Sequence, residues 1–284
     1  MKAETINHAV VVGVGTMGQG IVQVMAQVGI EVTVVDITRE HAQKGVGVLQ
    51  ENLNRRVAQG KMTAHQAQAI LQHVHVADGF PACGQAQVAI EAVVEDRNIK
   101  RDVFRQLDNV CPPDTVLLTN TSTLSPTDLA SMTRRPQAVA GFHFMNPVPV
   151  MKLVEIVTGL DTAPETVTFA RELARRLGKV PVVAREHPGG IVSRIMIAMR
   201  NEAIRIYAEG IASAQDIDQA MMLGGNWPMG PLALTDLVGV DIHLHNAESL
   251  SRDLGPCYMP PPLVKIMVRA GKLGRKTGEG FFKY

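Results

Sequence analysis

Ala9-Val10-Val11-Val12-Gly13-Val14-Gly15-Thr16-Met17-Gly18 joins a short apolar run to a glycine-rich turn near the start of the chain. Apolar residues then recur at helical spacing as far as Gly29. A second apolar run, residues 31–35, ends at Asp36. This order predicts a strand, a tight turn, a helix and a second strand, which is how a doubly wound α/β sheet begins.

The glycine turn has the spacing of a dinucleotide-binding site. Gly13 permits the tight turn, Gly15 lets the backbone approach a pyrophosphate, and Gly18 allows close packing of helix on strand. Asp36, 18 positions after Gly18, would accept hydrogen bonds from the adenosine ribose and repel a 2′-phosphate. We therefore predict NAD at residues 13, 15–18 and 36, counting Thr16 and Met17 at the start of the helix. Arg39 leaves NADP open, and a glycine turn without a ligand is the structural alternative.

Strand-like runs and helical patterns alternate through the first two thirds of the chain. The predicted strands lie at residues 73–76, 88–91, 116–119, 138–142, 153–157 and 180–184, with helices at 99–110 and 164–177. This alternation predicts a doubly wound, mostly parallel Rossmann-type sheet over residues 1–185. Residues 186–284 show only helical patterns and are predicted to form a smaller all-α domain.

Two helices at residues 38–59 and 63–71 follow the second strand, where the minimal doubly wound unit has no helix pair. We expect them to form an added helical arm. Arg55, Arg56 and Lys61 cluster on this arm and could meet phosphates of a substrate. A solvated basic face is the alternative interpretation.

His143 and Glu155 flank a segment that contains Pro147 and Pro149. Residues 138–142 read as the end of a buried strand, and residues 153–157 as a neighbouring strand, so the two side chains could meet. A carboxylate that accepts the Nδ1–H of an imidazole leaves Nε2 free to act as a base. The segment therefore predicts a catalytic pair, with a buried structural pair as the alternative.

The composition excludes several classes of protein. The chain has 284 residues, 46% of them hydrophobic and 19% charged, with a net charge of +1. Nothing in this balance indicates binding to nucleic acid or to a membrane surface. Cys83, Cys111 and Cys257 are widely spaced, which fits a reducing compartment and no metal site. We expect a cytoplasmic protein.

Together these motifs resemble the NAD-dependent 3-hydroxyacyl-CoA dehydrogenase family, most closely its short 3-hydroxybutyryl-CoA dehydrogenases. The resemblance covers nearly the whole chain. It rests on six motifs in order, at residues 13–20, 91–95, 120–125, 143–155, 228–232 and 271–282.

The resemblance implies hydride transfer between C3 of a 3-hydroxyacyl-CoA and NAD. It implies that His143 is the general base, that Glu155 orients it, and that Ser122 binds the C3 oxygen. Arg55 matches a position that meets CoA. The residues implied around NAD are Asp36, Glu95, Lys100, Asn146 and Lys276. We also expect a homodimer through the helical domain.

One position departs from the family pattern. The family usually has an asparagine early in the first helix of the second domain, where this chain has Ser193. A serine is shorter and lacks the amide donors, so its contact with substrate or with His143 would need a water or be lost. Two rival functions stay open. A dehydrogenase of free 3-hydroxy acids would share this layout without needing the helical arm, and a non-catalytic NAD-binding structural or sensor protein is favoured by Ser193 alone.

Overall fold

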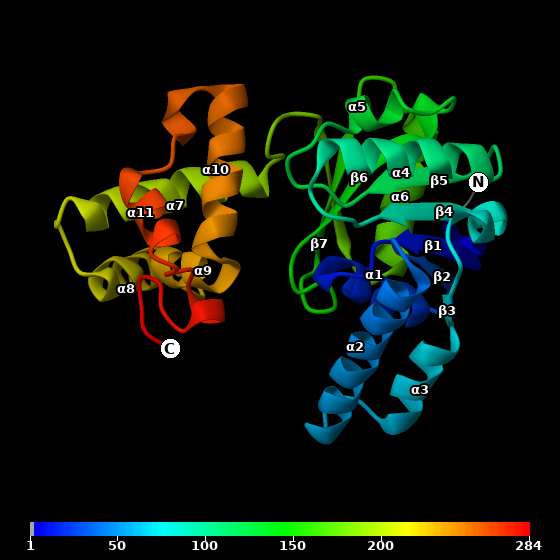
Figure 1. Ribbon diagram of the computed structural model, residues 1–284, viewed down its shortest axis with the longest axis horizontal. Helices are drawn as coiled ribbons and strands as arrows, with labels where there is room; N and C mark the ends of the chain where they lie inside the picture. Colours follow the sequence, from blue (N-terminus) through cyan, green and yellow to red (C-terminus); the bar gives the residue numbers. More distant parts are fainter. Residues whose placement is uncertain (1–2) are drawn as a thin grey trace. The chain divides into compact units, whose positions relative to one another are not determined.

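A computed structural model describes residues 3–284, which divide into two compact units. The first unit runs to His187 and the second begins at Pro188. The predicted boundary at residue 186 lies two positions before this point. Figure 1 shows the sheet in the first unit and only helices and loops in the second.

The described residues form one sheet of eight strands in the order β3-β2-β1-β4-β5-β6-β7-β8. Within it, β6 and β7 are the one antiparallel pair, and the other neighbours are parallel. The predicted fold class is confirmed. The strands are β1 His8–Val12, β2 Glu31–Val35, β3 Val74–Val76, β4 Val88–Glu91, β5 Val116–Thr119, β6 Val139–Phe144, β7 Leu153–Thr158 and β8 Val180–Arg185.

Helices cover both faces of this sheet (Figure 1). On one face, α1 and α6 pack against the even-numbered side chains of β6, Phe142 among them. On the other face, α4 and α5 pack against residues such as Leu117. The helices of this unit are α1 Thr16–Ala26, α2 Arg39–Ala58, α3 Ala64–Gln72, α4 Arg97–Val110, α5 Pro126–Ala130 and α6 Pro164–Arg176.

The helices α2 and α3 form the expected arm, which projects from the sheet in Figure 1. Thr38 caps α2, and Thr63 forms a capping box with Gln66 at the start of α3. Leu49 and Leu53 of α2 are buried in the same core cluster as Ile70 of α3. The arm is therefore a packed part of the first unit.

The second unit consists of α7 Val192–Ala208, α8 Ala214–Gly224, α9 Pro231–Val238, α10 Val240–Leu254 and α11 Pro262–Arg269. Buried carboxylates hold its loops. Asp218 accepts from the amides of Leu232 and Ala233 at the start of α9. Asp236 accepts from the amides of Phe281 and Phe282, which binds the C-terminal segment to α9. Among the described residues, no helix is long and apolar enough to cross a membrane.

Two features differ from the sequence-based expectations. The strand predicted to end at Phe142 continues to Phe144, because the β6–β7 ladder pairs Phe144 with Val154. The helix α5 was not predicted, since five residues are too few to show a helical period. Short 3₁₀ turns complete the chain at Ala3–Thr5, Phe80–Gln85, Pro136–Ala138, Pro256–Tyr258 and Arg275–Thr277.

A buried histidine lies in the core of the helical unit. His243 of α10 is fully buried, and its Nε2 lies 3.0 Å from Oδ1 of Asn201. Burial, together with the guanidinium of Arg200, lowers the pKa of His243 from an ordinary value of 6.5 to about 3. The folded protein therefore holds this imidazole neutral at pH values where the unfolded chain takes up a proton.

Acidification should consequently destabilise the helical unit. Below pH 6.5 the unfolded chain binds a proton at His243 and the folded chain does not, until the pH approaches 3. This group alone should lower the free energy of unfolding by up to about 1.4 kcal/mol for each pH unit within that window. The measurement is denaturant unfolding from pH 7 to pH 4.

His243→Gln should flatten this dependence, because glutamine takes up no proton. The matched control is His245→Gln, an exposed position on the same helix, which should keep the dependence of the parent protein. Equal slopes for the parent and for His243→Gln would exclude His243 as the acid-sensitive group.

Candidate active site

The glycine turn leaves open space in front of the first turn of α1. Gly13 has a φ of 92°, and a Cβ there would lie 2.7 Å from the carbonyl oxygen of Ala92. A Cβ on Gly18 would lie 1.9 Å from the carbonyl oxygen of Gly13. A Cβ on Gly15 would meet no atom within 4 Å. A pyrophosphate fits this arrangement, because the N-terminus of a helix favours an anion and Gly15 leaves room for one.

Asp36 lies directly against this turn. Its Oδ2 accepts from the amide of Val14 at 2.8 Å, and its Oδ1 accepts from the amide of Ile37 at 2.8 Å. Thr16 at the start of α1 is exposed, whereas Met17 packs against the core. Arg39, which left NADP open, pairs with Asp78 at 2.6 Å. The predicted ribose-binding carboxylate is thus held by the same turn that would hold the pyrophosphate.

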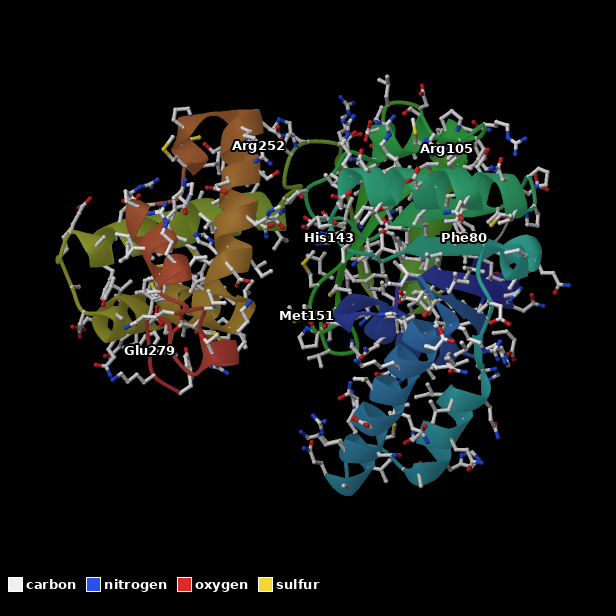
Figure 2. All side chains as sticks on the ribbon, viewed as in Figure 1. Phe80, Arg105, His143, Met151, Arg252 and Glu279 are labelled. Atoms are coloured by element: carbon white, nitrogen blue, oxygen red, sulfur yellow. The ribbon has the colours of Figure 1, made fainter. Side chains whose placement is uncertain are left out.

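His143 and Glu155 lie directly opposite each other in the antiparallel ladder of β6 and β7. Nδ1 of His143 is 2.9 Å from Oε2 of Glu155. The carboxylate side chain is 1% exposed and the imidazole 12%. In Figure 2, His143 lies toward the carboxyl ends of the parallel strands, whereas Phe80 lies at the other end of the sheet. The predicted contact between these two side chains is therefore present.

The loop after β5 lies next to β6. Oδ1 of Asn120 accepts from the amide of Phe144 at 2.9 Å, which joins this loop to the strand of His143. The partly exposed Ser122 follows within two residues. The amide of Ser122 donates to Oε1 of Glu95 at 3.0 Å. Asn120 was not among the predicted site residues; its position at the carboxyl end of a parallel strand was the available signal.

A buried ion pair lies behind this loop. Nζ of Lys100 is 2.6 Å from Oε1 of Glu91 and 3.2 Å from Oε2 of Glu95, and neither Lys100 nor Glu91 has an exposed side chain. Burial raises the pKa of Glu91. Burial also acts on Glu95, but the ammonium of Lys100 and the hydroxyl of Thr121 outweigh it and lower the pKa of Glu95. Sequence reasoning placed Lys100 beside NAD and missed its pairing with Glu91.

A second buried lysine holds the loop that follows His143. Asn146, which precedes a cis proline peptide, is exposed on this loop. Nζ of Lys179 donates to the carbonyl oxygen of Val148 at 2.5 Å and to that of Met151 at 2.8 Å. Burial lowers the pKa of Lys179. Lys179 was not predicted from the sequence, because the residues around it do not indicate that distant carbonyl groups will accept from its ammonium.

Two predicted site residues belong to the second unit. Ser193 is partly buried in the first turn of α7. Lys276 lies near the C-terminus and forms an ion pair of 2.6 Å with Asp241 of α10. The roles predicted for Ser193 and Lys276 stay predictions.

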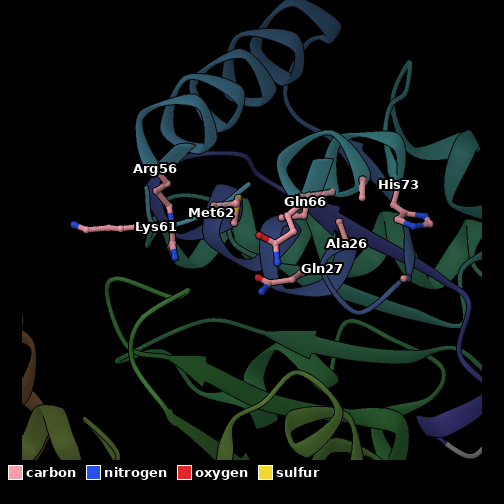
Figure 3. Close-up of a pocket in the computed structure, with 10 residues that line it drawn as sticks. Ala26, Gln27, Arg56, Lys61, Met62, Gln66 and His73 are labelled. Carbon is pink, nitrogen blue, oxygen red and sulfur yellow. The ribbon is translucent and has the colours of Figure 1, made fainter. Parts of the chain in front are cut away.

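The predicted basic cluster on the arm is divided by the structure. Arg56 and Lys61 line a pocket of about 450 Å³ together with Gln27, whereas Arg55 is exposed and lies outside it. Nε of Arg56 is shielded from solvent and has no hydrogen-bond partner among the described residues. Figure 3 shows Lys61 extended away from the other lining side chains. The pocket is also lined by Ala26, Gly29, Met62, Gln66, Ala69, Ile70 and His73.

Two family models match the chain. Residues 8–187 match the 3-hydroxyacyl-CoA dehydrogenase NAD-binding domain, and residues 189–284 match the 3-hydroxyacyl-CoA dehydrogenase C-terminal domain. The chain belongs to the 3-hydroxyacyl-CoA dehydrogenase family. It is accordingly an NAD-dependent oxidoreductase, and the family and cofactor expected from the sequence are confirmed.

Individual members of the dehydrogenase family resemble the chain over nearly its whole length. A 3-hydroxybutyryl-CoA dehydrogenase of Clostridioides difficile is 47% identical, covering 96% of this chain and 98% of that protein. A probable 3-hydroxybutyryl-CoA dehydrogenase of Bacillus subtilis is 42% identical, covering 98% of each. The crystal structure of (S)-3-hydroxybutyryl-CoA dehydrogenase from Ralstonia eutropha has a TM-score of 0.93 and 39% identity, covering 99% of each chain.

Lys179→Met should loosen the loop between β6 and β7. The substitution removes the donor to two carbonyl groups and should lower the free energy of unfolding by about 1–3 kcal/mol. Chemical denaturation checks the stability, and NADH titration checks the predicted contact of Asn146. The matched control is Lys152→Met, an exposed position on the same loop, which should cost far less. Equal losses in the two variants would contradict the assignment.

Proposed function

We propose that the chain catalyses the reversible oxidation of a short-chain 3-hydroxyacyl-CoA to the 3-oxoacyl-CoA, with NAD as the redox partner. The observation that carries this proposal is the pair formed by His143 and the buried Glu155, at the edge of the sheet where the glycine turn also lies. The 3-hydroxybutyryl-CoA dehydrogenases of Clostridioides difficile and Ralstonia eutropha support a short acyl chain.

His143 acts as the general base. Because Glu155 accepts the Nδ1–H, Nε2 is left as the basic nitrogen. It takes the proton of the C3 hydroxyl as the C–H electron pair leaves C3 and the C3–O double bond forms. When bound, NAD supplies the acceptor for that hydride. The carboxylate of Glu155, almost wholly shielded from water, stabilises the imidazolium that results.

Ser122 donates its hydroxyl hydrogen to the C3 oxygen and keeps that oxygen in line with His143. Its loop is joined to the strand of His143 through Asn120 and Phe144. In the reverse direction the imidazolium returns the proton to the oxygen of the 3-oxo group. Ser193 of the second unit is proposed to assist from the start of α7, as the asparagine usual in the family suggests.

Around NAD, the glycine turn binds the pyrophosphate and Asp36 binds the adenosine ribose. Asn146 and Lys276 are proposed to lie near the nicotinamide half. The open space in front of Gly15 supports this placement, and so does the position of Asp36 beside Val14.

The CoA portion is proposed to meet the helical arm. Arg56 and Lys61 line one pocket, and their two charges are proposed to bind phosphate groups there. Arg55, exposed nearby on α2, adds a third cation. A free 3-hydroxy acid carries no phosphate and would not use the arm.

The assembly and the location of the protein are also proposals. We infer a homodimer through the helical unit, supported by exposed apolar side chains such as Ile195 and Leu223, which are 60% and 76% exposed. A cytoplasmic location is supported by three free cysteines, and a role in fatty acid metabolism by the proposed acyl-CoA substrate.

His143→Gln should abolish most turnover while NADH still binds. Loss of a general base costs about 10²- to 10⁴-fold in kcat, whereas the glycine turn is untouched. The assay follows NADH absorbance with acetoacetyl-CoA, and the titration follows NADH fluorescence. His75→Gln, exposed on β3, is the control. A variant at position 143 with undiminished kcat would remove this histidine from the mechanism.

Arg56→Gln should raise KM for acetoacetyl-CoA about tenfold, the loss of roughly one charge-assisted hydrogen bond, with kcat unchanged. With acetoacetyl-pantetheine, which has no phosphate, the same variant should match the parent protein. Arg105→Gln on α4, on the opposite face of the sheet, is the control. Free acetoacetate should be turned over far more slowly than the thioesters. Equally fast turnover of the free acid would favour the free-acid dehydrogenase.

A further inference from the structure

One carboxylate oxygen accepts four hydrogen bonds from the loop that carries Ser122. Oε1 of Glu95 accepts from the amides of Ser122 at 3.0 Å and Thr123 at 3.1 Å, from the Thr123 hydroxyl at 3.2 Å and from the Thr121 hydroxyl. The Thr121 oxygen in turn accepts from the amide of Leu124 at 2.9 Å. The loop from 121 to 124 is therefore held, directly or through Thr121, by one side chain of the segment between β4 and α4.

The other oxygen of Glu95 lies against Lys100, which is fully buried. Lys100 is 0% exposed, and its ammonium lies within 3.4 Å of Glu91, Glu95 and the carbonyl oxygen of Val93. Glu91 is itself fully buried and accepts from the amide of Val93 and the hydroxyl of Thr119, both at 2.7 Å. The three donors of the ammonium thus match three acceptors of the protein.

We propose that Glu95 is a positioning residue that holds the loop of Ser122, and that Lys100 is its internal counter-ion. This inference rests on the proposed role of Ser122 in binding the C3 oxygen. It adds to the expectation that both side chains contact NAD, because it gives them a second task inside the protein.

Holding this loop in place matters because a displaced Ser122 hydroxyl would slow the reaction. A displacement of about 1 Å of a positioned group can cost about 100-fold in rate. The amide of Ser122 has Glu95 as its acceptor, and that acceptor is a charged group, which makes a shorter and stronger bond than a neutral one. Lys100 keeps the charge on Glu95 in a place where burial alone would favour the neutral form.

Hydrogen exchange measures the attachment of the loop directly. Glu95→Gln removes the charge and leaves one acceptor oxygen and one NH2 group, so either the loop amides or the ammonium of Lys100 must face a donor. Exchange in a peptide covering residues 119–126 should accelerate about tenfold. The control is Asp96→Asn, which removes a neighbouring carboxylate that caps α4 through the amides of Asn98 and Ile99. Unchanged exchange in Glu95→Gln, with the protein folded, would overturn the assignment.

Steady-state kinetics then separate a positioning role from a cofactor contact. At saturating NADH, Glu95→Gln should lower kcat for acetoacetyl-CoA about 10- to 100-fold, whatever the change in the NADH dissociation constant. A tenfold weaker binding of NADH at unchanged kcat would assign Glu95 to the cofactor and overturn the proposal.

A double-mutant cycle with Ser122→Ala tests whether the loss of kcat in Glu95→Gln acts through Ser122. If Glu95 acts through the serine, adding Glu95→Gln to Ser122→Ala should lower kcat by less than about twofold further. Additive losses would show that Glu95 acts elsewhere. Undiminished kcat in Ser122→Ala alone would overturn the role of the serine, and the exchange measurement would still decide whether Glu95 holds the loop.

Discussion

A carboxylate shut away from water beside an imidazole is the interaction on which the candidate site depends. At 1% exposure, the side chain of Glu155 could not remain charged without a donor, and His143 is 2.9 Å away. An unpaired charge at such a depth costs several kcal/mol. The imidazole is therefore oriented by the fold itself before any ligand binds, with Nδ1 toward Glu155 and Nε2 on the other side of the ring.

Other charged side chains at this edge of the sheet are also held by hydrogen-bonding partners within the protein. Glu95 and Lys100 are drawn together beneath one loop, and Lys179 lies beneath another. Glu95 accepts from amides and hydroxyls of the loop after β5, and Lys100 supplies the opposite charge beneath it. Lys179 donates to two carbonyl groups of the loop after β6. Loops are ordinarily the most mobile parts of a chain. Charged side chains that lie beneath these two loops and bind to them restrict that motion.

How much could be predicted depended on how far apart the interacting residues lie. The glycine turn could be predicted because Gly13, Gly15 and Gly18 act within one turn of chain, and alternating strands and helices indicated the sheet. The contact of His143 with Glu155 followed from two adjacent strands. The buried pairing of Lys100 could not be predicted, because a lysine in an amphipathic helix is expected to reach water. Its two carboxylates come from the end of β4 and from the segment that follows it. The partners of Lys179 were hidden for a similar reason, as carbonyl groups leave no mark on a sequence.

The reversal of direction between β6 and β7 has a consequence for how such a protein can change over generations. A slip of one position in this ladder would move Glu155 to the opposite face of the sheet, so the pairing tolerates no drift. In the segment between the strands, residues 145–152, Lys179 fixes the carbonyl groups of Val148 and Met151, whereas the side chain of Val150 is 65% exposed. Substitutions at such exposed positions leave the register of the ladder, and with it the contact of His143 with Glu155, unchanged.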